Sequence, residues 1–502
     1  MANLSRRDFL KYSIGGMAVL VIGSRLSWLA NNPAYAATQT VSLRIGDAIK
    51  QMHTHNALNN AECYFWMYKS VEPDLPHDCP GPVIIATKGD TINISVENSL
   101  DEPHAFAIPD IGFTSGAIQP GDTFSGVIDL AAAPAGAYLY YDNLNEPVNR
   151  IMGLHGALIV MPAAPSGARW TPYDTVTPAV QQLFDDFGST DHFPGLAWEE
   201  GDSTSWALND AFPEHGVLNQ PNCPPFRQYV WLAHQASPKL FMEVGNSAPG
   251  DPIRNPTNFM NAFLRDPFTP HAFHADNPGG NRIAQYFTFS GQSGFFAHDS
   301  PVITPMGRVG EPCVVHILNA GLWTHSMHLH ANHFYVTSVN GVVRDNVFSL
   351  DTFEVGPMDR VDYVLPFNRP PDVPNVRGIG RPDEPLVSPS SGQPVWPPIE
   401  EMNAFLPAAG TTAPGSGVEL GQRLSPLCFP MHDHSEPSQT SQGGNYNTGL
   451  ISGMYFTGDR NTPGHFDFEM EEDFHMMFKN VRGVTVIPPA TLPAAPPHNE
   501  LP

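Results

Sequence analysis

Two pairs of histidines in this 502-residue chain are spaced so that each pair places two imidazoles on one side of a β-strand. His328 and His330 form one pair, and His432 and His434 form the other. Residues i and i+2 of a strand face the same way, about 6.5–7 Å apart at Cα. Two such strands lying side by side direct four imidazoles into one pocket, and imidazole nitrogen is a good ligand for copper, zinc, iron or nickel. We therefore predict a shared metal site at His328, His330, His432 and His434.

His325 and Asp433 are predicted to face away from this pocket. Asp433 stands between the two histidines of its pair, and His325 is an odd number of residues from His328. Strand alternation turns both side chains to the opposite side of the strands. Two arrangements stay open there: a hydrogen-bonded His–Asp pair, which we favour, and a weak oxygen/nitrogen metal site at His325 and Asp433.

The segments that must position these residues have the pattern of short strands separated by turns. The chain holds 52 prolines and 43 glycines and no long apolar-periodic stretch, which favours an all-β fold. We expect strand-rich units at 40–165 and 284–460, the second carrying a loop insertion at 370–425. Residues 166–283 are either a connecting region or a degenerate third β-domain, and 461–502 form a tail.

The N-terminus has the layout of a twin-arginine export signal. "SRRDFLK" at 5–11 precedes a short apolar run, and "PAYAA" at 33–37 offers an A-x-A cleavage site. The apolar run is shorter than the ~20 residues that a membrane span needs. We predict removal of residues 1–36, no membrane span afterwards, and a periplasmic or otherwise exported mature chain.

Charge and cysteine usage exclude several functions. The formal net charge is −25, which disfavours nucleic acid and anionic membrane surfaces because both attract clustered lysine and arginine. Metal ions, a small-molecule substrate and a redox-protein partner remain. None of the five cysteines lies in a C-x-x-C frame, so a zinc ribbon and c-type haem attachment lack support.

The histidine motifs resemble those of the multicopper oxidases. "HSMHLHANHF" at 325–334 is similar to their H-P-x-H-L-H-G-H motif, and "PMHDHSEPSQTSQGGNYNTGLISGM" at 430–454 occupies the place of H-C-H-x-x-x-H-x-x-x-G-M. In the first domain, "GPVIIATKGDTINISVENSLDEP" is similar to the opening P-G-P…G-D…N-x-L segment of that family, and "GLHGALIV" is similar to its G-L-x-G-x-x-I-V segment. The resemblance implies at least two cupredoxin-like Greek-key β-sandwich domains and copper as the cofactor. It makes His328, His330, His432 and His434 cluster ligands and His325 a blue-copper ligand.

The sequence also departs from the family pattern. Asp433 replaces the blue-copper cysteine, and no histidine lies from Ser435 to Gly464 to supply the other blue-copper imidazole. "AFAIPDIG" and "LYYDN" stand where the family has H-W-H-G and W-Y-H-S-H, so four of the eight cluster histidines are absent. Other residues of the chain are candidates to substitute, although each is more simply explained as structural: His53, His55, His104, His155 and, for a relocated thiolate, Cys428.

Three functions stay open. The first is an exported copper-binding oxidoreductase with a reduced four-histidine site and no usual blue copper centre. The second is a copper-free cupredoxin scaffold or binding protein, and the third is a periplasmic metal carrier. The lost thiolate removes the soft Cu–S bond that couples copper centres in the family, which disfavours four-electron reduction of oxygen. Two-domain members of the family often form trimers, and the resemblance therefore implies a homotrimer.

Overall fold

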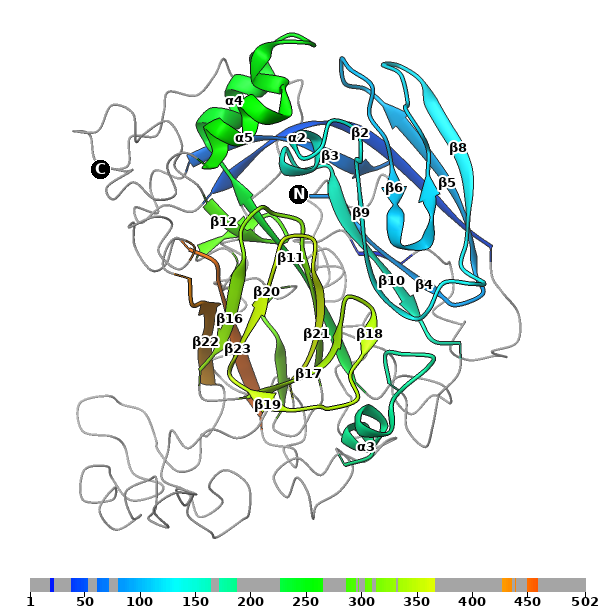
Figure 1. Cartoon of the computed structure of the whole chain (residues 1–502), viewed down its shortest axis with the longest axis vertical. Coiled ribbons are helices and arrows are strands. Elements are labelled where there is room, and N and C mark those ends of the chain that lie inside the picture. Colours follow the sequence, from blue (N-terminus) through cyan, green and yellow to red (C-terminus); the bar gives the residue numbers. More distant parts are fainter. Residues whose placement is uncertain are drawn as a thin grey trace, which may run out of the picture.

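A computed structural model provides the three-dimensional structure (Figure 1). It describes the residues in the following ranges: 19–21, 38–52, 61–71, 80–163, 171–186, 226–264, 286–294, 297, 303–308, 313–330, 333–365, 427–435, 438 and 449–458. The predicted insertion at 370–425 and the predicted tail at 461–502 lie outside these ranges.

The first half of the chain forms a sandwich of two β-sheets. One sheet has the order β1 (Val19–Val21), β4 (Val83–Thr87), β10 (His155–Met161), β9 (Gly136–Tyr141), β6 (Ala107–Ile108) and β7 (Phe113–Thr114). The other has the order β3 (Ala61–Ser70), β2 (Thr38–Met52), β5 (Thr91–Asn98) and β8 (Thr123–Asp129). The helical turns η2 (Pro109–Ile111) and α2 (Val148–Ile151) connect strands of the first sheet. The chain alternates between the sheets from β4 to β9, as Greek-key connections require.

The second half repeats this architecture. Its larger sheet has the order β13 (Gln292–Ser293), β12 (Tyr286–Phe289), β11 (Arg227–Ala236), β15 (Cys313–Asn319), β21 (Arg360–Leu365), β17 (Phe334–Val339) and β18 (Val342–Val343), with β19 (Ser349–Leu350) also pairing with β17. The smaller sheet has the order β14 (Met306–Arg308), β23 (Ile451–Gly458), β22 (Leu427–Asp433), β16 (His325–Leu329) and β20 (Thr352–Val355). The predicted all-β class with two cupredoxin-like sandwiches is confirmed.

The described part of 166–283 contributes a strand and helices. β11 pairs in parallel with β15 and therefore belongs to the second sandwich. The helices are α3 (Pro178–Asp186), α4 (Pro238–Asn246), η5 (Pro252–Arg254) and α5 (Pro256–Leu264). α4 and α5 lie together at one end of the molecule and α3 at the other (Figure 1). Phe241 of α4 contacts Phe65 of β3 edge to face at 5.5 Å.

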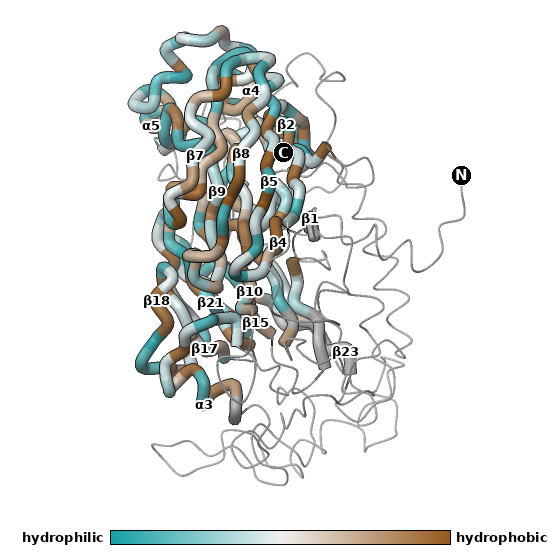
Figure 2. Tube along the Cα trace, turned by 90° about the vertical axis from the view of Figure 1, so that its right-hand side faces the viewer, coloured by the Kyte–Doolittle hydropathy of each residue, from teal (hydrophilic) through white to brown (hydrophobic). Residues whose placement is uncertain are grey.

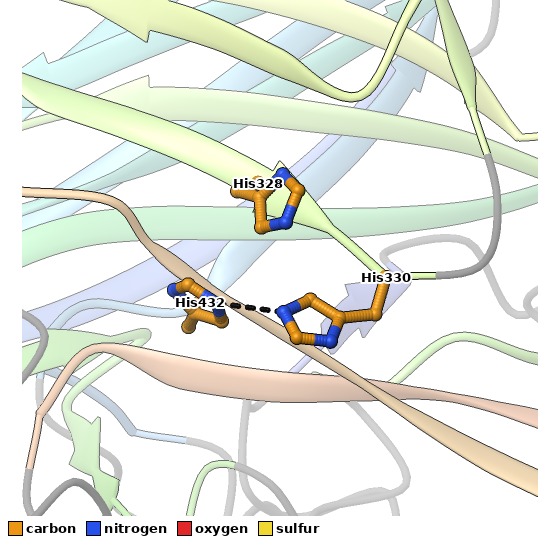
Figure 3. Close-up of side chains that lie close together, drawn as sticks. All are labelled: His328, His330 and His432. Atoms are coloured by element: carbon orange, nitrogen blue, oxygen red, sulfur yellow. Dashed lines mark hydrogen bonds between the residues drawn. The ribbon is translucent and has the colours of Figure 1, made fainter.

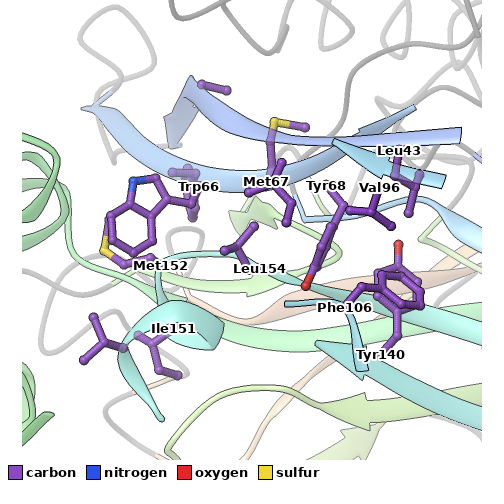
Figure 4. Packing of buried hydrophobic residues seen from close by; sticks show 14 of the residues in the cluster. Leu43, Trp66, Met67, Tyr68, Val96, Phe106, Tyr140, Ile151, Met152 and Leu154 are labelled. Carbon is purple, nitrogen blue, oxygen red and sulfur yellow. The ribbon is translucent and has the colours of Figure 1, made fainter. Parts of the chain in front are cut away.

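Each sandwich has its own apolar core. In the first, Trp66, Tyr68, Phe106 and Tyr140 are buried between the sheets (Figure 4). Hydrophobic residues follow the strands, whereas hydrophilic residues concentrate in the connections (Figure 2). Burial of these side chains is the main free-energy gain that opposes the entropy lost when the long strands are ordered.

The two sandwiches pack against each other through β10 and β11. In β10, Leu158 and Val160 face the first core, while Ala157 and Ile159 face a separate cluster. This interface cluster also contains Leu232 of β11. A strand covered on both faces needs apolar side chains at successive positions, which explains the uninterrupted run "ALIVM" in β10.

Within the described residues, no helix has the length and apolar character needed to cross a membrane.

Truncation at the interface between the sandwiches tests this packing. Leu232 is 0% exposed, so we expect Leu232→Ala to lower the free energy of unfolding by about 2–5 kcal/mol through lost burial and a cavity. Denaturant unfolding followed by tryptophan fluorescence measures the change. The control Val342→Ala, at a side chain that is 68% exposed, should stay within about 0.5 kcal/mol of the parent. Equal losses in both variants would contradict the packing described for Leu232.

Candidate metal centre

The register of two neighbouring strands brings the histidine pairs together. β16 and β22 are antiparallel, and His328 lies directly opposite His432. Burial alternates along β16: His325, Met327 and Leu329 are buried, whereas His328 is half-buried. The buried side of β16 therefore faces the sandwich core, and the histidine side faces outward.

Four imidazoles gather on this outward side, and we call them the histidine cluster: His328, His330, His432 and His434. The ring centroid of His328 lies 4.9, 5.1 and 5.2 Å from those of His330, His432 and His434, respectively. One ligand nitrogen from each of His328, His330 and His432 lies within 4.8 Å of the others, and these three rings converge in Figure 3. The structure thus brings together the four residues that the spacing singled out.

Backbone carbonyls orient two of the imidazoles. His328 Nδ1 donates to the carbonyl of Asp351 at 3.0 Å, and His432 Nδ1 donates to the carbonyl of Asp433 at 2.9 Å. A carbonyl oxygen only accepts, so in both rings Nδ1 holds the proton and Nε2 keeps the lone pair. Metal-ligating histidines characteristically use the second nitrogen in this way. His432 Nε2 lies 2.9 Å from His330 Nε2 and accepts its N–H, so Nε2 of both rings lies inside the cluster.

The electrostatics keep His432 and His330 in the neutral form that can bind a metal. Burial, followed by the neighbouring His330, His328 and His434, lowers the pKa of His432 to about 4, although the bond to the Asp433 carbonyl acts in the opposite direction. Burial and the charges of His328 and His434 also lower the pKa of His330. Both imidazoles are therefore unprotonated at pH 7, as metal ligation requires.

His325 and Asp433 form a pair on the core side of the same strands. His325 Nδ1 donates to Asp433 Oδ2, and the Ser438 hydroxyl donates to the same oxygen. Asp433 Oδ1 accepts the N–H groups of Ser326 at 2.8 Å and Ser435 at 3.0 Å. Burial favours the protonated carboxyl, but His325 and these donors outweigh burial and hold the pKa of Asp433 below its usual range. The hydrogen-bonded arrangement is the one that the structure contains.

A blue copper centre does not fit at this position. Such a centre needs a thiolate, whereas Asp433 supplies a carboxylate whose two oxygens already accept four hydrogen bonds. The histidine cluster is a better fit for a metal ion, since it presents converging nitrogen donors with oriented rings. Among the described residues, His328, His330 and His432 make up the group of histidine, cysteine and acidic side chains close enough to hold one ion.

The other sequence candidates lie elsewhere. His104 donates Nδ1 to Asp142 at 2.7 Å in the first sandwich, and His155 donates Nδ1 to the Arg150 carbonyl at 3.0 Å. Both are fully buried and have hydrogen-bond partners within the first sandwich, as expected for structural histidines. His53 and His55 are outside the described residues, and Cys428 is described only through its backbone, which pairs with Tyr455.

Sequence reasoning missed three polar residues that contact the sequence candidates. Ser438 donates to Asp433, and Gln235 Nε2 lies 3.0 Å from His325 Nε2. The ring of His234 lies against that of His155 at a tilt of 47°, with ring centroids 4.6 Å apart. Gln235 and His234 are consecutive residues of β11, and the alternation of the strand sends one toward each sandwich. No local pattern distinguishes these residues, because their partners are distant in the chain.

Comparison with known proteins agrees with the resemblance noted in the sequence. Residues 75–165 match the family model described as multicopper oxidase. Solved structures that resemble the chain include the blue copper oxidase from Nitrosomonas europaea, with 15% identity, a TM-score of 0.45, and coverage of 89% of this chain and 95% of that one. The copper nitrite reductase from Nitrosomonas europaea shows 14% identity, a TM-score of 0.42, and coverage of 85% and 98%. The multicopper oxidase mgLAC shows 15% identity, a TM-score of 0.44, and coverage of 90% and 97%. No curated protein matches.

The buried pair His155 and His234 predicts loss of stability in acid. Burial lowers the pKa of His234 to about 3 and that of His155 well below its usual value. The unfolded chain binds protons at these rings below about pH 6.5, whereas the folded protein does not. The contribution of the two neutral rings to the free energy of unfolding is therefore fully present above pH 6.5 and is lost as the pH drops from 6.5 toward 3. For His234 the loss is about 2 kcal/mol at pH 5.

Thermal unfolding at pH 7.5 and pH 5 measures this dependence. His234→Gln retains a donor for the Ile151 carbonyl, which His234 Nε2 contacts at 2.7 Å, and should reduce the pH dependence. His333→Gln, at an exposed position, should leave it as in the parent. An unchanged pH dependence in His234→Gln would show that this ring is not responsible.

Proposed function

We propose that this chain, whose residues 75–165 match the multicopper oxidase family model, is an exported copper protein with oxidoreductase chemistry at a reduced, four-histidine site. The observation that carries the proposal is the convergence of His328, His330 and His432 nitrogens within 4.8 Å. Copper is the metal that the family implies, and neutral imidazoles are suitable ligands for it.

Some residues at the proposed site would hold the metal, and others orient the residues that hold it. His328, His330 and His432 would hold the metal, and His434 would complete the set, since its ring lies 5.2 Å from that of His328. The carbonyls of Asp351 and Asp433 hold the Nδ1 protons of His328 and His432 and keep Nε2 of each ring directed into the cluster. A bound copper ion would supply one-electron redox chemistry.

The same residues argue against the usual chemistry of multicopper oxidases. Asp433 occupies the position of the cysteine that normally connects the blue copper to the cluster, and its oxygens are engaged by His325, Ser438 and backbone N–H groups. We therefore propose electron exchange with a small-molecule substrate or a redox protein directly at the histidine cluster. The twin-arginine pattern at 5–11 supports work in the periplasm, and the homotrimer remains a prediction.

Removal of two ligands tests metal binding at the cluster. We expect His328→Ala combined with His434→Ala to abolish tight copper binding, measured by competition with a chelator and by elemental analysis. The β-core should persist, because both rings lie on the outward side of the strands. The matched control His333→Ala changes an exposed histidine of the same motif and should bind copper like the parent. Equal copper content in the double variant would favour the copper-free scaffold.

Spectroscopy of the copper-loaded protein tests the kind of site. We expect no intense copper–thiolate absorption, since a carboxylate replaces the thiolate at Asp433. A deep blue preparation would contradict this prediction and would make Cys428 the ligand to investigate.

A redox cycle distinguishes enzyme from carrier. For an oxidoreductase, ascorbate should reduce the bound copper and an oxidant such as ferricyanide should restore it, with the metal retained throughout. Release of copper on reduction would instead identify a metal carrier.

A further inference from the structure

Each sandwich contains a His–Asp pair that is completely shielded from solvent. His104 and Asp142 form the pair of the first sandwich, and His325 and Asp433 form that of the second. All four side chains are 0% exposed. In both sandwiches the histidine donates Nδ1 to Oδ2 of the aspartate.

Two further bonds of each carboxylate correspond atom by atom, and Asp433 accepts one more bond, from the N–H of Ser326 at 2.8 Å. In the first sandwich, Oδ2 also accepts Asn149 Nδ2 at 2.9 Å, and Oδ1 accepts the N–H of Leu144 at 2.8 Å. In the second, Oδ2 also accepts the hydroxyl of Ser438, and Oδ1 accepts the N–H of Ser435 at 3.0 Å. Leu144 and Ser435 each stand two residues after their aspartate, so these two Oδ1 bonds are equivalent. We call each set of donors around one aspartate a carboxylate cage.

The backbone that carries the cages corresponds as well. The N–H of Asp142 donates to the Leu154 carbonyl at 3.0 Å, and Leu154 donates to the carbonyl of Asn149 at 3.1 Å. The N–H of Asp433 donates to the Leu450 carbonyl at 3.0 Å, and the N–H of Leu450 donates to the carbonyl of Ser438 at 2.7 Å. Both leucines follow a glycine in the sequence.

An asparagine six residues before each histidine completes the match. Asn98 Nδ2 donates to the Glu102 carbonyl at 2.8 Å and to the Ile118 carbonyl at 2.9 Å, and Ile118 is the strand partner of His104. The second sandwich repeats these bonds. There Asn319 Nδ2 donates to the Trp323 carbonyl at 2.7 Å and to the carbonyl of Val355, the strand partner of His325, at 3.1 Å.

The two cages differ in what surrounds them. The positions that correspond to the histidine cluster in the first sandwich, counted from His104 and Asp142, are occupied by Ala107, Pro109, Tyr141 and Asn143. The first cage therefore exists without a cluster of imidazoles. Such a cage needs no metal for its own stability, because every bond to its carboxylate comes from the protein.

We infer that the carboxylate cage is a duplicated structural unit, and that in the second sandwich Asp433 has become a positioning residue for the histidine cluster. Asp433 lies between His432 and His434 in the chain, and its Oδ1 accepts the N–H of Ser326 at 2.8 Å. The His434 N–H donates to the Ser326 carbonyl at 2.8 Å. These bonds hold β22 against β16 at the level where the two histidine pairs meet. The link to metal affinity rests on the proposed function.

A matched pair of substitutions tests the inference. Asp433→Asn and Asp142→Asn each place an amide where the carboxylate accepted bonds, so donors would face donors. We expect both variants to show lower unfolding midpoints. Only Asp433→Asn should also weaken Cu²⁺ and Zn²⁺ binding, by about tenfold or more, because groups that orient ligating histidines affect metal affinity by that amount. Asp142→Asn should bind both metals as the parent does.

Imidazole resonances of the metal-free protein give a readout that does not depend on metal binding. Asp433→Asn should shift the ring signals of His432 and His434, whereas Asp142→Asn should leave them unchanged. If either variant fails to fold, Ser438→Ala and Asn149→Ala remove a single donor from the corresponding cages and make the same comparison.

The outcomes separate this inference from the proposed function. Failure of the parent to bind either metal would overturn the proposed function, while the ring signals would still decide whether Asp433 positions the cluster. Unchanged ring signals in Asp433→Asn would overturn the positioning role. Equal shifts in both aspartate variants would show general loosening of the fold and would also overturn it.

Discussion

The carboxylate of Asp433 is the interaction on which the candidate site depends most. It accepts bonds from His325 and Ser326 on one strand and from Ser435 and Ser438 beyond the next. A buried carboxylate is costly unless its lone pairs are satisfied, and here four donors satisfy them. The aspartate consequently fixes how the two histidine-bearing strands meet, and on the other side of the strands the imidazoles converge.

The same carboxylate limits the chemistry. It is a hard oxygen donor with its lone pairs already engaged, so it provides neither a soft metal ligand nor a covalent route for electrons. On the outward side, burial and the neighbouring imidazoles lower the pKa of His432 and of His330 and keep these two rings neutral. The outcome is a candidate metal site beside a position that has no thiolate.

The interface between the sandwiches links the two halves of this arrangement. Along β11, His234 contacts the first sandwich through the Ile151 carbonyl, and Gln235 contacts His325 and the N–H of Leu322 in the second. Apolar packing around Leu232 holds this strand in place. The cages, the interface and the cluster therefore form one connected structure.

The sequence alone determined the all-β class and the side of the strand on which each site residue lies. Both follow from local geometry, since i, i+2 spacing decides that His432 and His434 share a face and that Asp433 does not. Tertiary structure decided which strands became neighbours, and therefore that β11 joined the second sandwich and that Ser438 closed the cage around Asp433. It also decided that His104 has Asp142 as its partner, which makes the two cages alike. These contacts join residues far apart in the chain, and the short-range pattern of a sequence carries no information about which distant donor reaches a given carboxylate.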